Sequence, residues 1–116
     1  MSGDIVWVNG PYQAGTYPDV NIFRNDLRNK LSEKELIVAD SGYMDNKCVF
    51  NDGASEELLQ NIRARQESVF KRIRQFHILS HRYRHGLDKL SNIFFAVAQL
   101  TQISIENGGK LFSINL

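Results

Sequence analysis

A chain of 116 residues is long enough for one hydrophobic core and too short for two, so we expect a single domain spanning residues 1–116. Hydrophobic residues make up 42% and charged residues 23%, a balance that excludes global disorder. The single cysteine excludes a disulfide framework within the chain, and no apolar run reaches the roughly 20 residues that a membrane span needs. The first residues lack the pattern of a signal peptide, so the sequence predicts a soluble intracellular protein without a membrane partner.

The first half of the chain predicts two strands with a helix between them. Residues 5–8 form a β-branched and aromatic run that ends in a turn, and residues 36–39 form a second apolar run. Apolar residues recur at helical spacing over residues 20–31, and Pro18 suits the first helical position. The polar residues 45–53 are expected to be irregular. A strand, a helix and a strand in this order favour an α/β fold.

The second half of the chain predicts mostly helix. An apolar stripe over residues 58–76 indicates a long helix that continues to a break at His85-Gly86, and Ser55 is a suitable N-cap for it. A last helix is predicted from about Leu87 to residues 107–109, where glycine accepts the left-handed conformation common at helix C-termini. Residues 111–114 are either a strand or an apolar tail on the core. The prediction is therefore a short sheet with three main helices.

Asp40 is the first candidate for a functional side chain. It follows an apolar strand directly and precedes a Ser41-Gly42 turn. Ligand-binding groups collect at the carboxyl ends of strands in open α/β sheets, and a carboxylate there suits Mg²⁺. The alternative is an Asp that accepts backbone hydrogen bonds from its own turn, which is the commoner role before glycine.

Glu67 is the second candidate, because it is the single acid between Arg63 and His85. Its position on the predicted helix is at the margin of the apolar stripe, from which it could reach a site at the edge of the sheet. The alternative is a surface ion pair with Arg63 or Lys71, which lie four residues before and after it.

The segment from residue 63 to residue 85 is strongly basic. It contains seven cations and one acid, so it carries +6 while the rest of the chain carries −5. A basic helical segment is typical of proteins that bind the phosphates of DNA or RNA, and the alternative is a solvated face paired with the acidic remainder. The candidate nucleic-acid contacts are Arg63, Arg65, Lys71, Arg72, Arg74, Arg82 and Arg84.

Three histidines in the same segment are spaced four residues apart, at positions 77, 81 and 85. On one continuous helix this spacing would place them on one face, as zinc ligands require. No cysteine or carboxylate is near them in the sequence, and Gly86 indicates a helix end. We therefore interpret them as polar or core-edge residues that add donors and some positive charge below neutral pH.

Several blocks of the sequence together resemble the C-terminal part of the catalytic core of DDE-superfamily transposases, most closely the PIF/Harbinger-like endonucleases and their bacterial insertion-sequence relatives. The blocks keep the order and spacing of that family and cover almost the whole chain. The block at residues 39–43 is similar to the family's second-Asp motif, and the block at residues 63–72 is similar to its Glu-bearing helix. The matching blocks are residues 3–12, 18–24, 39–43, 63–72, 76–79 and 95–102.

The resemblance implies a partial RNase H-like fold whose first strands are missing, and Mg²⁺- or Mn²⁺-dependent cleavage and strand transfer of DNA in the complete protein. In that chemistry two metal ions activate the attacking oxygen and stabilise the leaving oxygen. Asp40 corresponds to the second metal ligand and Glu67 to the third. The partner is DNA, in the nucleus if the source is eukaryotic.

One departure from the family pattern limits the expected activity. No block in this chain contains the family's first Asp, and Asp4 and Asp19 are not its equivalents, since neither follows a core strand. We therefore expect little or no nuclease activity from this chain alone, as from a fragment, a truncated reading frame or a degenerate copy. The alternatives are a non-catalytic nucleic-acid-binding module that uses the basic helix 63–85, and a structural domain that dimerises through an exposed sheet edge.

Overall fold

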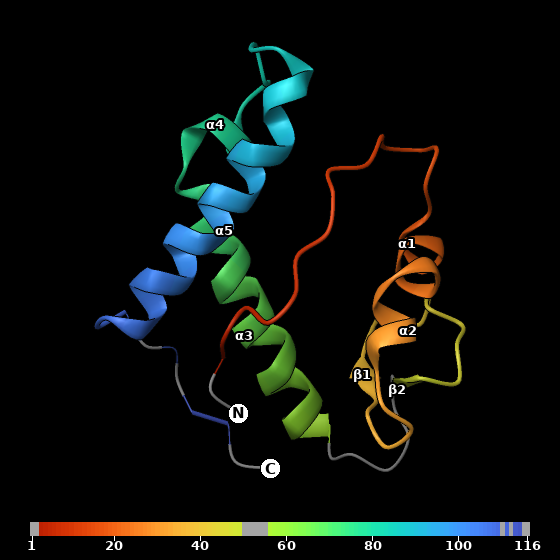
Figure 1. Ribbon diagram of the computed structural model, residues 1–116. Helices are drawn as coiled ribbons and strands as arrows, with labels where there is room; N and C mark the ends of the chain where they lie inside the picture. The colour runs from red at the N-terminus through yellow and green to blue at the C-terminus, as the bar shows by residue number, and fades with distance from the viewer. Residues whose placement is uncertain (1–2, 50–55, 110, 112, 115–116) are drawn as a thin grey trace. The chain divides into compact units, whose positions relative to one another are not determined.

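The computed structural model describes residues 3–49, 56–109, 111 and 113–114. It is a mixed α/β structure, mostly helical, with a parallel sheet of two short strands, which confirms the predicted α/β class (Figure 1). The chain divides into two compact units. We call Tyr12–Gln60 the strand unit, and Met1–Pro11 together with Asn61–Leu116 the helical unit.

The strand unit begins with two short helices in place of the single predicted one. Helix α1 spans Asp19–Asn25 and helix α2 spans Leu27–Lys30, and Pro18 is the N-cap of α1. The break falls at Asp26, whose φ of −131° and ψ of −76° lie outside the helical region. Its carboxylate accepts the Lys30 ammonium at 2.7 Å, across one helical turn. The predicted helical periodicity is therefore correct, but the backbone turns within it.

The sheet consists of β1 (Ile37–Val38) and β2 (Cys48–Val49), which pair in parallel. The first strand was predicted. The second was not, because residues 45–53 were expected to be irregular, and two residues are too few to show an alternating pattern. Residues 50–53 of that stretch lie outside the described part of the chain.

Asp45 holds the connection between the two strands in place. Its carboxylate accepts the Lys47 backbone N–H at 3.0 Å, the Arg28 Nε at 3.1 Å and the Arg24 Nε at 3.3 Å. These donors, led by the Lys47 N–H, hold the pKa of the Asp45 carboxyl below its usual value. The side chain is only 7% exposed. A parallel pair normally needs a longer crossover, so these bonds help to explain how so short a connection is held.

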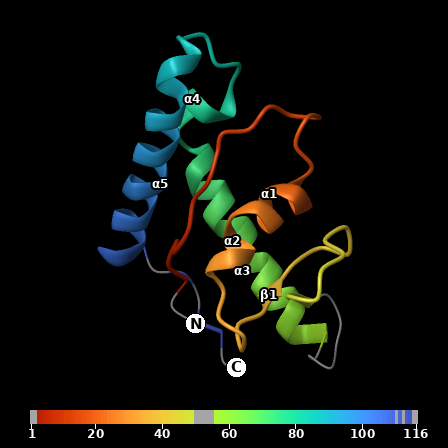
Figure 2. The same ribbon diagram turned by 45° about the vertical axis from the view of Figure 1, so that its right-hand side comes forward.

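The helical unit takes in helix α3, which spans Glu56–Arg74 and enters the unit at Asn61. The predicted N-cap, Ser55, lies outside the described residues. The predicted helix does not continue to His85-Gly86, because α3 ends at Arg74. The chain goes on through α4 (His77–Ser80), the 3-10 helix η1 (Leu87–Lys89) and α5 (Leu90–Glu106), as Figure 2 shows from a second direction. Gly108 follows α5 with a φ of +125°, in agreement with the predicted glycine end.

The core of this unit lies along one side of α5. Val97, Ala98 and Ile105 are buried there, together with Thr101, whose hydroxyl donates to the Val97 carbonyl at 2.8 Å. Ile114 is also buried, which agrees with the predicted apolar tail, while residue 112 lies outside the described residues.

The strand predicted at residues 5–8 does not form. This segment is extended but unpaired in any sheet of the described residues, and Val6 is 91% exposed. The Ile5 N–H donates instead to the Gln102 side-chain oxygen at 2.7 Å, and the Gln102 amide donates to Asp4. A β-branched run becomes a strand only beside another strand, and here its neighbour is a helix. Within the described ranges, no helix has the length and apolarity needed to cross a bilayer.

Candidate nucleic-acid interface

One side of α3 is an exposed and mostly cationic face. Arg63, Glu67, Phe70, Lys71 and Arg74 recur at spacings of three and four, which places them on the same side of the helix, and all five are exposed. The Phe70 ring is 47% exposed among these charges. We call these five residues the α3 face. Three cations and one acid give it a net positive charge.

Two of the seven predicted contact residues point the other way. Arg65 is 6% exposed, and its Nη1 lies 3.6 Å from the position that a Cβ on Gly3 would take. Arg72 donates from Nη1 to the Gly109 carbonyl, just beyond the end of α5. A guanidinium there also interacts favourably with the partial negative charge at a helix C-terminus. Both side chains are therefore engaged within the helical unit, Arg65 buried and Arg72 partly buried.

Glu67 lies in the middle of the α3 face, flanked by two of its cations. In the described part of the chain it forms no ion pair with Arg63 or Lys71, the pairing expected if its role were only structural. Its carboxylate is exposed and open to an external ligand. The surrounding positive charge repels a bare divalent cation, so a metal would bind here only with other anions beside it.

Asp40 lies at the carboxyl end of β1, as predicted, and is exposed. Its Oδ1 accepts the Ser41 backbone N–H at 2.6 Å and the Ser41 hydroxyl at 3.3 Å, and its carbonyl accepts the Tyr43 N–H at 2.9 Å. Asp40 therefore accepts hydrogen bonds within its own turn, which was the alternative to a metal-binding role. Burial, followed by the negative charges of Asp19, Cys48 and Asp40, raises the pKa of the Tyr43 hydroxyl.

The predicted pair of metal ligands falls on different units: Asp40 belongs to the strand unit and Glu67 to the helical unit. No group of three or more His, Cys, Asp or Glu side chains suitable for a metal occurs among the residues described. Exposed carboxylates are chemically suitable for Mg²⁺ or Mn²⁺, whereas the full donor set of a two-metal centre is not assembled from these residues. The metal site therefore stays a prediction.

The histidines do not share one helix face, because the helix is interrupted twice between residues 74 and 85. His77 starts α4, His81 follows its last residue, and His85 lies in the segment before η1. The rings of His77 and His81 are nevertheless 5.2 Å apart. Residues 77–78 and 81–85 line a recess of about 430 Å³, which we call the 77–85 recess.

Arg82 and Arg84 are exposed and belong to the lining of this recess. Two of the seven predicted cations thus lie in an irregular segment that also contains aromatic rings. The sequence does indicate this arrangement, because cationic and ring-bearing side chains alternate between residues 81 and 85. Helical spacing alone did not reveal it.

No family model, curated protein or solved structure matches this chain.

Proposed function

We propose that this chain binds DNA through the α3 face, as the C-terminal part of a DDE transposase-like core with a partial RNase H-like fold. The observation that carries the proposal is the orientation of the cations on α3. Three of them, Arg63, Lys71 and Arg74, are exposed on one side of a single rigid helix. The sequence blocks that resemble the transposase family support DNA as the polyanion.

The electrostatics of the α3 face suit a phosphate backbone. Residues four apart on a helix are separated by about 6 Å along its axis, and residue 74 lies eleven positions beyond residue 63, or about 16 Å. Adjacent phosphates along one DNA strand are spaced on a comparable scale, so several can be contacted at once. The Phe70 ring adds an apolar surface between the charges. Such contacts position a protein on DNA without reading its sequence.

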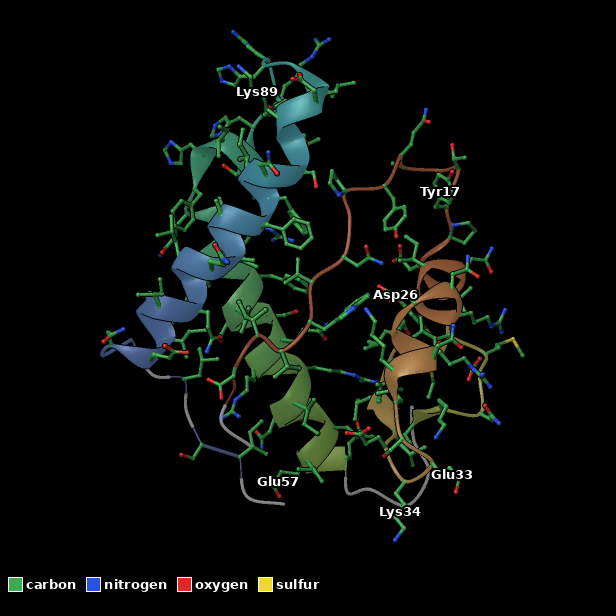
Figure 3. The ribbon with its side chains drawn as sticks, viewed as in Figure 1. Tyr17, Asp26, Glu33, Lys34, Glu57 and Lys89 are labelled. Carbon is green, nitrogen blue, oxygen red and sulfur yellow. The ribbon has the colours of Figure 1, made fainter. Side chains whose placement is uncertain are left out.

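The test is a binding measurement with a matched pair of substitutions. Labelled duplex DNA is titrated with the 116-residue protein at low salt and followed by fluorescence anisotropy. Lys71→Gln on the α3 face is expected to weaken binding severalfold. Lys34→Gln, which removes the same charge from an exposed side chain in the turn before β1, is expected to leave it unchanged (Figure 3). If both substitutions weaken DNA binding equally, the affinity depends on the net charge of the protein and not on the α3 face.

We further propose that Asp40 and Glu67 serve as the second and third carboxylates of a Mg²⁺ or Mn²⁺ centre, which would polarise a phosphodiester for attack. Mn²⁺ binding is measured by electron paramagnetic resonance in the presence of duplex DNA. Asp40→Asn and Glu67→Gln are each expected to weaken it, and Glu33→Gln, at an exposed glutamate in the turn before β1, is the matched control. If Asp40→Asn and Glu67→Gln both bind Mn²⁺ as well as wild type does, the proposed metal site is refuted. The proposal that the α3 face binds DNA would be unaffected.

A second candidate function is nucleic-acid binding without chemistry. The observation that favours it is the hydrogen bonding of Asp40 Oδ1 within its own turn, which gives this carboxylate a role without a metal. Because no block matches the family's first Asp, both candidates predict little or no cleavage by this chain alone. Strong Mg²⁺-dependent cleavage that Asp40→Ala abolishes would contradict the second candidate, and it would also contradict the expectation that this chain alone is inactive.

A further inference from the structure

The 77–85 recess combines positive charge with flat rings. It is formed within the helical unit by α4 and the segment that follows it, and its volume is about 430 Å³. Arg82 and Arg84 belong to its lining, and no acidic residue is part of that lining among the described residues. The nearest acid in the sequence is Asp88 of η1, whose carboxylate lies against Gly86. The charge of the recess therefore favours an anion.

Hydrogen bonds hold two rings of the recess in place, those of Tyr83 and His81. The Tyr83 hydroxyl donates to the Gly86 carbonyl at 3.1 Å, and the Tyr83 ring meets the His85 ring edge to face at 5.5 Å. His81 Nδ1 is 3.0 Å from the Ser80 hydroxyl and 3.3 Å from the His77 carbonyl. Rings whose orientation is fixed before binding lose little entropy when a ligand stacks on them.

The size of the recess distinguishes between anions. A free phosphate has few atoms and would leave most of this space unfilled, whereas small-molecule sites typically measure about 300–1,000 Å³. Cations that follow a backbone, together with aromatic rings on which bases stack, are the combination that binds single-stranded nucleic acid. In a duplex the bases are paired and stacked within the helix, so their faces are not available to protein rings.

We propose that the 77–85 recess binds one unpaired nucleotide of a nucleic-acid strand. Arg82 and Arg84 contact its phosphate, and the rings of Tyr83 and His85 provide the surface on which its base stacks. This site is separate from the α3 face in residues and in the form of nucleic acid that it takes. Either proposal can therefore fail without the other.

The test uses the full chain and a labelled oligothymidylate of about eight nucleotides, long enough to fill one single-strand site of the usual size. Removing one stacking ring typically weakens such binding about fivefold or more. We expect Tyr83→Leu to show this loss, and Tyr83→Phe, which keeps the ring but not the hydrogen bond to the Gly86 carbonyl, to bind more tightly than Tyr83→Leu and more weakly than wild type. Tyr17→Leu is the matched control, since Tyr17 is an exposed tyrosine of the strand unit (Figure 3).

Two further measurements keep the proposal open to refutation. Arg84→Gln, at an exposed side chain whose loss should not affect folding, is expected to weaken oligothymidylate binding as well. Thymidine monophosphate is expected to displace the oligonucleotide at lower concentration than inorganic phosphate does. The proposal is overturned if Tyr83→Leu and Arg84→Gln both bind like Tyr17→Leu, or if inorganic phosphate competes as well as the nucleotide.

Discussion

The orientation of the arginines on α3 leads to a prediction that separates cations exposed on the α3 face from those engaged within the helical unit. Arg72 and Arg74 are two residues apart on the same helix, and both were predicted from the sequence to contact DNA. The structure places Arg74 on the exposed face, while Arg72 donates to the Gly109 carbonyl. Replacing each with glutamine removes the same charge from two different environments.

The expected magnitude follows from counterion release. Each cation that neutralises a phosphate of B-DNA contributes about 0.9 to the slope of log K against log salt concentration. Arg74→Gln should therefore reduce the slope by about 0.9, and the triple variant Arg63→Gln/Lys71→Gln/Arg74→Gln by about 2.7. Between about 50 and 200 mM salt, the three contacts alone account for a loss of about 40-fold in affinity. Arg72→Gln should leave the slope unchanged and lower the melting temperature instead.

The assay is duplex DNA binding by fluorescence anisotropy at four or more salt concentrations, with a thermal melt of each variant. The three exposed cations of the α3 face predict a wild-type slope of about −2.7. If Arg82 and Arg84 also contact the duplex, the slope becomes no steeper than about −4.5, whereas all seven predicted cations would give about −6.3. A slope near the steepest of these values, or an Arg72→Gln variant whose slope falls as far as that of Arg74→Gln, would refute this division of the arginines.

Three further predictions, one of them with Gly42→Ala as its control, concern stability and reactivity. The pKa of Asp45 is lowered in the folded state, so its contribution to stability is complete above its usual pKa and is lost as the pH falls through the lowered value. In urea denaturation the free energy of unfolding should therefore decline below about pH 4. The decline should be smaller in Asp45→Asn. Gly109→Ala places a Cβ 2.8 Å from the Ser104 carbonyl oxygen and should destabilise the protein by about 1–3 kcal/mol in the same assay. Gly42→Ala, where no described atom lies within 4 Å, should cost less than about 0.5 kcal/mol. Burial, with the charge of Asp45, raises the pKa of the Cys48 thiol, so a thiol reagent should label it slowly near pH 8 until the protein is unfolded.

The long helices were predictable because their apolar spacing extends over many turns. The pattern that predicted α3 also contained the division of its arginines: Arg65 and Arg72 are seven residues apart, on the side that carries Ile62, Val69 and Ile73. Counting charge along the segment without placing it on the helix missed this. The apolar spacing of α3 was enough to separate the two sets of arginines, whereas the sum of charges along the segment was not.

The short elements were not predictable in the same way. Strand β2 has two residues, and its position depends on the hydrogen bonds of Asp45 with residues on α1 and α2, more than fifteen positions away. Residues 5–8 have the composition of a strand but contact α5, a pairing that local sequence cannot indicate. The 77–85 recess exists because the helix stops at Arg74 and again at Ser80, so histidine spacing on one ideal helix gave the wrong geometry.

The surroundings of Lys47 have a consequence for chemical modification. Its ammonium group donates to the carbonyls of Ser32, Glu33 and Glu35, at 2.6, 2.9 and 3.4 Å. Acetylation would remove both the charge and most of the donors, leaving three carbonyl oxygens close together without a cation between them. Monomethylation would preserve the charge and two donors. Lys47 should therefore accept a single methyl group with the turn before β1 intact, whereas an acetyl group at the same nitrogen should open that turn.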